Sequence, residues 1–139
     1  MNNIVLATDG STYSDAAARY LTNNLLLKHD LTVHVVHCEP GVTGDVQAFI
    51  SHDEIAAWHH EQSEKAMQSV TEILRGGNLA VECHEFVGFA PERIVEYADT
   101  VQAVAIVMGS HHRPPFLNAI IGSVSGRVLA QAHCPVLLI

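Results

Sequence analysis

Two glycine-serine pairs bracket the stretch of sequence that is best suited to bind an anion. Gly109-Ser110 ends an apolar run, and Gly122-Ser123 opens a pattern typical of a helix. Glycine allows the backbone to approach a ligand closely, and successive amides after it can form a concave anion site. A helix N-terminus adds unpaired N–H groups and the positive end of the helix dipole. Together with the hydroxyls of Ser123 and Ser125, the two pairs predict a two-sided phosphate cradle.

The phosphate cradle has a structural alternative, in which Gly109 ends a strand and Gly122-Ser123 caps a helix without any ligand. The segment lacks the Gly-Lys-Ser/Thr ending of a P-loop and the G-x-G-x-x-G pattern of dinucleotide-binding folds. The residues alone therefore leave both interpretations open.

Histidine is the next residue type with chemical potential, and the chain contains ten copies. His59 and His60 are neighbours on a predicted helix and point about 100° apart, so they do not form a chelating i, i+4 pair. His52 and His59 can share a helix face, but no third ligand is evident. We therefore expect no dedicated metal site. We also expect no catalytic nucleophile, because the sequence has no G-x-S-x-G elbow and no evident base for Ser123.

The elements that position these residues alternate along the chain. Short apolar runs, several of them rich in β-branched residues, predict strands, and amphipathic segments with capping signals predict helices between them. On the longest predicted helix we expect Trp58 and Met67 to be core contacts. The predicted strands lie at residues 3–10, 31–40, 79–88, 103–110 and 134–139, and the predicted helices at 11–30, 51–77, 90–100 and 122–133.

Strands separated by helices need crossover connections, so the sheet should be parallel with helices on both faces. The sequence contains no internal repeat and no dividing linker, and 139 residues suffice for one domain. We therefore predict a single-domain α/β fold over residues 1–139. In such folds ligands bind beyond the carboxyl ends of the strands, where the strand order reverses. Asp9-Gly10 and Gly109-Ser110 both lie at the carboxyl ends of predicted strands.

The composition excludes several classes of function. With 48% hydrophobic and 16% charged residues, the chain is typical of a globular protein. Its formal net charge of −8 and its seven scattered basic residues argue against nucleic-acid binding. No apolar run approaches the ~20 residues that span a bilayer. Three cysteines without a CxxC pair, and no secretory leader, are typical of reduced cytosolic thiols. We expect a cytoplasmic protein that binds neither nucleic acid nor membrane.

Over essentially its whole length the chain resembles the universal stress protein family. The matching segments are NIVLATDGS at the start, VHVVHCEP at the second predicted strand, VGFAPERIVEYA before the fourth, and residues 107–139. In nucleotide-binding members the family pattern is glycine, two residues, glycine, nine residues, glycine, and then serine or threonine. Gly109, Gly122 and Ser123 stand at their expected positions, with the nine-residue spacer from Arg113 to Ile121.

The resemblance implies a Rossmann-like, open five-stranded parallel sheet in the order 3-2-1-4-5, with a cleft between the first and fourth strands. It further implies a stress-response sensor or switch that forms a homodimer through its last strand. The implied ligand is ATP or another adenine nucleotide, with Mg²⁺ or Mn²⁺ beside the phosphates. Asp9 would contact the adenine or ribose, and Cys38 would line the adenine pocket through its neighbouring backbone. The residues that would hold the ribose and phosphates are Gly109, Gly122, Ser123, Val124 and Ser125.

His112 stands where the family pattern has its second glycine, and we include it among the predicted ligand-binding residues. A histidine enters the left-handed backbone region only at a cost of about 1–2 kcal/mol. Its imidazole would either intrude on a phosphate or, when protonated, contact it. Pro114 and Pro115 also remove two backbone donors. Two alternatives stay open: a dimerisation module that binds no nucleotide, and a slow nucleotide hydrolase assisted by Asp9.

Overall fold

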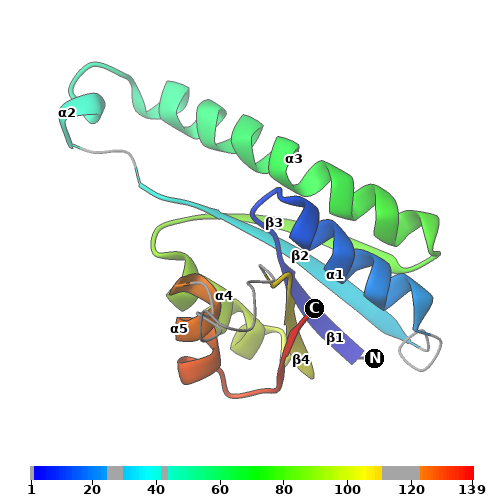
Figure 1. Cartoon of the computed structure of the whole chain (residues 1–139). Helices are drawn as coiled ribbons and strands as arrows, with labels where there is room; N and C mark the ends of the chain where they lie inside the picture. The colour runs from blue at the N-terminus through cyan, green and yellow to red at the C-terminus, as the bar shows by residue number, and fades with distance from the viewer. Residues whose placement is uncertain (1, 25–29, 42–43, 111–122) are drawn as a thin grey trace, which may run out of the picture.

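The computed structural model describes residues 2–24, 30–41, 44–110 and 123–139, in which strands and helices alternate as predicted (Figure 1). A short helix, α2, interrupts the alternation between the second strand and the long helix α3. In chain order the elements are β1 (Asn2–Ala7), α1 (Thr12–Asn23), β2 (Leu31–Glu39), α2 (Gly44–Gln47), α3 (His52–Gly76), β3 (Ala80–Val87), α4 (Ala90–Thr100), β4 (Ala105–Met108), α5 (Ser123–Gln131) and β5 (Val136–Leu138).

The strands form one five-stranded sheet in the order β3-β2-β1-β4-β5, and every neighbouring pair is parallel. This confirms the order that the family resemblance implied. β1 pairs with β2 on one side and with β4 on the other, so the strand order reverses between β1 and β4. A ligand site is therefore expected at the carboxyl ends of these two strands.

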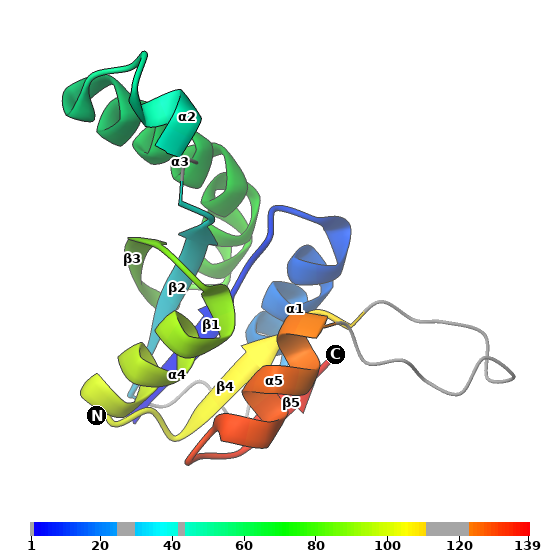
Figure 2. The same ribbon diagram turned by 90° about the vertical axis from the view of Figure 1, so that its left-hand side faces the viewer.

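Helices cover both faces of the sheet, with α1 and α3 on one side and α4 and α5 on the other (Figures 1 and 2). Successive β1 residues alternate between the two hydrophobic cores. Ile4 and Leu6 pack with residues of α1 and α3, whereas Val5 and Ala7 pack with residues of α4 and α5. A strand buried on both faces needs a continuous apolar run, which explains why β1 and β4 lack polar alternation.

Of the two core contacts predicted on α3, one is confirmed and one is wrong. Met67 is a core contact as predicted, but Trp58 is 46% exposed, so its predicted core role is wrong. Trp58 lies nine residues before Met67, which at 3.6 residues per turn puts it on the opposite side of the helix. The buried side of the helix consists of His59, Ser63, Met67, Val70, Thr71 and Leu74.

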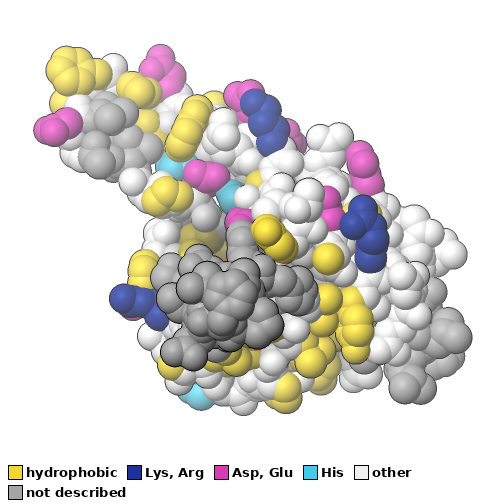
Figure 3. All heavy atoms as spheres, in the orientation of Figure 1, with side chains coloured by type: hydrophobic (Ala, Val, Ile, Leu, Met, Phe, Trp, Pro, Cys, Tyr) yellow, Lys and Arg dark blue, Asp and Glu magenta, His cyan; other side chains and the backbone are white. Residues whose placement is uncertain are grey.

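Among the described residues on the face shown in Figure 3, the Lys and Arg side chains lie apart from one another. Two of the basic side chains are paired with carboxylates on their own helices, Lys65 with Glu61 and Arg93 with Glu96. Within the described ranges, no helix combines the length and the apolar character needed to cross a membrane.

Candidate functional site

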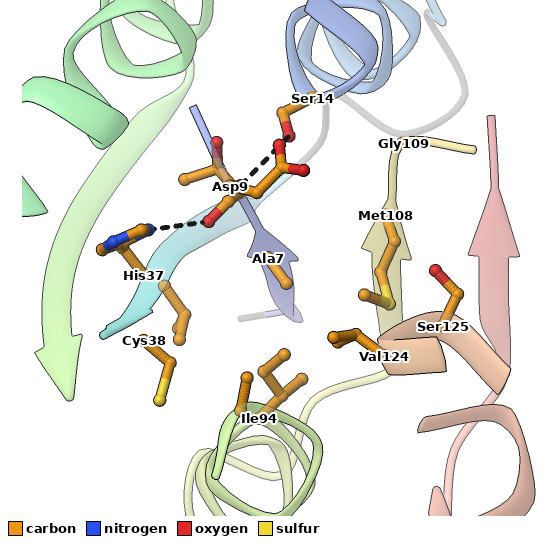
Figure 4. Close-up of a pocket in the computed structure, with 13 residues that line it drawn as sticks. Ala7, Asp9, Ser14, His37, Cys38, Ile94, Met108, Gly109, Val124 and Ser125 are labelled. Atoms are coloured by element: carbon orange, nitrogen blue, oxygen red, sulfur yellow. Dashed lines mark hydrogen bonds between the residues drawn. The ribbon is translucent and has the colours of Figure 1, made fainter. Parts of the chain in front are cut away.

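A pocket of about 300 Å³ lies at the carboxyl ends of β1, β2 and β4, at the predicted reversal of strand order (Figure 4). Strand ends form its base, and the first turns of three helices, α1, α4 and α5, form its rim. The lining residues are Ala7, Thr8, Asp9, Ser14, Val36, His37, Cys38, Ala90, Ile94, Met108, Gly109, Val124 and Ser125.

The pocket brings together Asp9, Cys38, Gly109, Val124 and Ser125, which sequence analysis had assigned to one ligand site. These residues come from three strand ends and one helix start, which are far apart in the sequence. Of the other predicted site residues, His112 and Gly122 lie outside the described residues. Ser123 begins α5, and its side chain also lies outside the described part of the chain.

Asp9 is the second residue after the end of β1 at Ala7 and is held by the start of α1. Its Oδ1 accepts hydrogen bonds from the backbone N–H of Ser11 at 2.9 Å and from the hydroxyl of Ser14 at 3.1 Å. Partial burial raises the pKa of the Asp9 carboxyl, but hydrogen bonds from Ser11 and Ser14 lower it, and the net pKa lies below the ordinary 3.8. Asp9 is thus an ionised acceptor, suited to hydroxyl or amino groups of a ligand and unfavourable for a phosphate beside it.

Gly109 is required by packing. A Cβ on this residue would lie 2.3 Å from the carbonyl carbon and oxygen of Tyr13 and 2.7 Å from the Ser14 nitrogen. The end of β4 therefore passes directly against the first turn of α1, in support of the structural interpretation of this glycine. The same contact holds the Gly109 backbone at the wall of the pocket.

The amide after Gly109 is not available to an anion. The Ser110 N–H donates to the Ile139 carbonyl at 2.7 Å, and the Ser110 hydroxyl donates to the same oxygen at 2.8 Å. These bonds continue the pairing of β4 with β5 beyond the strand ends. The Ser110 amide therefore cannot be part of the predicted phosphate cradle, because its N–H is already bonded to the Ile139 carbonyl.

Among the described residues, the positive electrostatic potential in the pocket comes from the N-termini of helices. None of the described lining residues is Lys or Arg. Val124 and Ser125 lie in the first turn of α5, and Ala90 begins α4, so both helices direct the positive ends of their dipoles toward the pocket. The α5 side thus suits an anionic group, and it lies across the pocket from the Asp9 carboxylate (Figure 4).

Apolar side chains make up much of the remaining wall. Ala7 and Val36 come from β1 and β2, Ile94 from α4, and Met108 from the end of β4. A flat heteroaromatic ring can bury its faces against such a surface, while polar groups at the edge of the pocket orient it. The pocket therefore combines an apolar wall, a hydrogen-bond acceptor and an anion-favouring side.

Cys38 and His37 belong to the polar edge formed by β2. Burial raises the pKa of the Cys38 thiol, against the opposing charge of Arg93, and its Sγ–H donates to the Gly88 carbonyl at 3.5 Å. The two His37 nitrogens lie 3.0 Å from the Thr8 carbonyl and 2.6 Å from Glu39 Oε1. His37 thus ties β2 to the turn after β1.

Sequence reasoning missed several lining residues, notably Ser14, His37, Ile94 and Met108. Ala7 and Val36 are also lining residues, and they lie side by side on neighbouring strands with their side chains on the α4 face of the sheet. The sequence could have identified them as neighbours only once the strand order was known. Ser14 lies in the first turn of α1, and Ile94 lies one turn inside α4. Periodicity marks both as inward-facing without indicating the end of the sheet at which they lie.

Comparison with known proteins gives one consistent result. The family model of the universal stress protein family matches residues 1–139. The universal stress protein MJ0531 of Methanocaldococcus jannaschii is 28% identical, over 98% of this chain and 80% of its own length. Four further universal stress proteins are 26% identical, and the chain spans only 42% to 48% of their length.

Solved structures with the same fold include nucleotide complexes. The universal stress protein of Archaeoglobus fulgidus in complex with dAMP is 27% identical, with a TM-score of 0.70, and the match covers 100% of this chain and 97% of that one. A family member from Arabidopsis thaliana with AMP bound has a TM-score of 0.71 over 100% of this chain and 91% of its own, but its 14% identity supports the fold alone.

Proposed function

This chain belongs to the universal stress protein family, and from that premise we propose that its pocket binds an adenine nucleotide, with ATP as the ligand, as the switch of a stress-response protein. The observation that carries the proposal is the meeting of Asp9 and the first turn of α5 in one pocket at the reversal of strand order. Support from outside the chain comes from the dAMP complex of the A. fulgidus relative.

The ligand's orientation follows from the chemistry of the walls. The adenine ring lies against the apolar wall formed by Val36, Ile94 and Met108. The ribose hydroxyls donate to the ionised carboxylate of Asp9. The phosphates point away from Asp9 toward the start of α5, because two negative groups repel each other and a helix N-terminus attracts an anion. The hydroxyl of Ser125 lies on that side of the pocket.

Any Mg²⁺ or Mn²⁺ in the complex would be held mainly by phosphate oxygens. Asp9 is the one carboxylate among the described lining residues, and it already accepts hydrogen bonds from Ser11 and Ser14. Mg²⁺ in nucleotide sites commonly keeps several waters and takes few protein ligands. The residues present are compatible with such an ion, whose role would be to neutralise phosphate charge.

The hydrolase alternative has less support. A general base works best with a pKa near the working pH, whereas the hydrogen bonds from Ser11 and Ser14 leave the pKa of Asp9 below 3.8. Asp9 is therefore a weak base for activating water. The proposal is a binding switch with no dedicated catalytic residue.

We also propose that the protein works as a cytoplasmic homodimer paired through β5. Edge strands present unpaired backbone groups that a second strand can complete, and β5 lies at one edge of the sheet in the described residues. Leu137 on β5 and Leu129 on α5 are apolar side chains that are partly exposed to solvent. Three free cysteines fit a reducing compartment.

Calorimetric titration of the purified protein with AMP, and with ATP in the presence of Mg²⁺, tests the binding proposal. Val124→Trp places a large ring in the pocket wall, and Ala130→Trp is the matched control on an exposed position of the same helix. We expect the wild type and Ala130→Trp to bind alike and Val124→Trp to bind at least about tenfold more weakly, a loss of about 1.4 kcal/mol. Equal binding by all three proteins would refute this location for the site.

The same titration also tests the alternative function, a dimerisation module that binds no nucleotide. Absence of binding at millimolar nucleotide, together with a dimer in sedimentation analysis, would favour that alternative. His112→Gly restores the glycine of the family pattern. Stronger ATP binding by this variant is the result expected if the imidazole obstructs the phosphates, and unchanged or weaker binding would reject that obstruction.

A further inference from the structure

A second cluster of chemically active side chains lies outside the nucleotide pocket, on the α4 face of the sheet. It consists of His34 on β2 with Glu82 and His84 on β3. In the register of the two strands, His34 is opposite Glu82 and Val36 is opposite His84. Since alternate residues of a strand share a face, Glu82 and His84 project on the same side as His34. Backbone pairing therefore brings the three groups together.

The three ligand atoms are spaced as a metal ion requires. His34 Nδ1 lies 3.3 Å from His84 Nε2 and 3.4 Å from Glu82 Oε2, and the last two atoms are 3.6 Å apart. A point about 2.0 Å from all three atoms exists at the centre of this triangle, and Zn–N and Zn–O bonds have about that length. The ligands of a tetrahedral zinc ion are about 3.3–3.4 Å apart, which closely matches the observed triangle.

Hydrogen bonds on the far side of His34 orient its ring toward this point. Asn3 donates through Nδ2 to the Val101 carbonyl at 2.8 Å, so its Oδ1 is the atom that faces His34 Nε2 at 3.2 Å. His34 Nε2 must therefore carry the proton, and its Nδ1 presents a lone pair to Glu82 and His84. Metal-binding histidines commonly have such a carbonyl partner on the second nitrogen.

His34 is buried, with 6% of the residue exposed, and burial disfavours a charge on its ring. A neutral imidazole is the form that binds a metal ion.

Tyr97 of α4 supplies a fourth oxygen at the same place. Its hydroxyl lies 2.6 Å from His84 Nε2 and 3.1 Å from His34 Nδ1. Without an ion, the hydroxyl donates to His34 Nδ1 and accepts from His84 Nε2–H, and this arrangement holds both rings near the spacing that an ion needs. With an ion bound, the His84 proton moves to Nδ1, and the Tyr97 oxygen lies beside the fourth ligand position.

We propose that His34, Glu82 and His84 bind a divalent transition-metal ion, Zn²⁺ by preference, with Tyr97 next to the fourth coordination position. Two imidazoles and one carboxylate suit Zn²⁺ and disfavour Mg²⁺ or Ca²⁺, which prefer oxygen ligands alone. The ion would join β3, an edge strand, to its neighbour β2. This site is independent of the nucleotide pocket and of any Mg²⁺ or Mn²⁺ bound there.

Other histidine–carboxylate pairs in the described residues lack this geometry. His60 has Glu64 at 3.1 Å from Nε2 and Glu85 at 3.0 Å from Nδ1. The two carboxylates face opposite nitrogens of the ring, so one ion cannot bind both of them through His60. His60→Gln is therefore a matched control, because it removes a histidine with two carboxylate neighbours without touching the proposed site.

Calorimetric titration of the full chain with ZnCl₂, after treatment with a chelator, tests the site. We expect one ion per chain in the wild type and in His60→Gln. We expect Glu82→Gln and His84→Gln each to weaken binding at least about tenfold, since even residues that only orient ligands cost 10–100-fold when they are changed. Thermal unfolding in the chelator should be similar for all four proteins, because Glu82 and His84 are not core residues.

Two results would overturn the proposal. One is zinc binding by Glu82→Gln and His84→Gln that is as tight as in the wild type. The other is a Co²⁺ complex whose spectrum has thiolate charge-transfer bands, which would assign the ion to a cysteine. If His84→Gln fails to fold, Glu82→Gln still decides the question, since the Glu82 side chain is 59% exposed.

Discussion

Replacing Gly109 by alanine tests the tight contact between the end of β4 and the first turn of α1. The added Cβ would lie 2.3 Å from two backbone atoms of Tyr13. Ordinary contacts of a Cβ are longer by about 1 Å, so α1 or the end of β4 must shift by about that distance. Overpacking of this kind costs about 1–3 kcal/mol. For a chain of this size we expect the Tm to fall by about 3–12 °C.

Gly76→Ala is the matched control for this substitution. A Cβ at Gly76 would meet nothing within 4 Å, and the residue is the last of α3. Alanine is a better helix former than glycine by up to about 1 kcal/mol, so the control should be as stable as the wild type or slightly more stable. Thermal and urea unfolding followed by circular dichroism give both values.

The outcome also bears on the site, because the Tyr13–Ser14 segment that must move carries the Ser14 hydroxyl that holds Asp9. Gly109→Ala should therefore weaken AMP binding as well as stability. A variant as stable as the wild type would refute the close contact. A variant that is as stable as the wild type but binds the nucleotide more weakly would instead indicate that Gly109 is needed for contact with the ligand.

Three further predictions concern the same elements. Folding lowers the pKa of Asp9 below 3.8, so its charge stabilises the fold above that pH and the effect is lost as the pH falls through the lower folded value. The stability gap between wild type and Asp9→Asn should accordingly close between about pH 5 and about pH 2 in urea unfolding, and a constant gap would contradict this. Met67→Ala should cost about 2–5 kcal/mol and Trp58→Ala about 1 kcal/mol or less, because only Met67 is buried, and equal losses would contradict the observed side of α3. The thiol of Cys38, whose pKa is raised by burial, should react with iodoacetamide more slowly than exposed Cys83. Mass spectrometry should also show that AMP protects Cys38 alone, and protection of both or of neither would argue against the pocket.

The sequence predicted the elements well because their patterns reflect burial on two faces. The runs that became β1 and β4 are continuously apolar, and both are covered by helices on each side. The order of the strands is different, since apolar runs of similar composition do not reveal which strands pair. That order came from the resemblance to a family, and with it came the position of the pocket.

The error at Trp58 has a local cause. Trp58 and Met67 are nine residues apart, so at 3.6 residues per turn their side chains point about 180° apart on α3. One side of the helix cannot bury both, and the side that carries Met67 and Val70 is the one that packs in the core. Apolar residues lie on both sides of the helix, so the sequence did not show which side would be buried.

The two sites differ in what the sequence revealed. Asp9 and Gly109 could be predicted because each lies just beyond the carboxyl end of a strand, where ligands of parallel sheets bind. The cluster of His34, Glu82 and His84 could not be predicted from helix spacings, because its geometry depends on the register between β2 and β3. The spacing of Glu82 and His84, two residues apart on a strand, was the only local signal.

The most direct test of the nucleotide site is a titration of ¹⁵N-labelled protein with AMP, followed by NMR. The site predicts that the largest shifts among the described residues occur in the turn of Asp9 and Gly10, at Cys38, and at Val124 and Ser125. The amides of β3, at the far edge of the sheet, should change little. Saturating shifts confined to other surfaces, or none at millimolar AMP, would contradict the account.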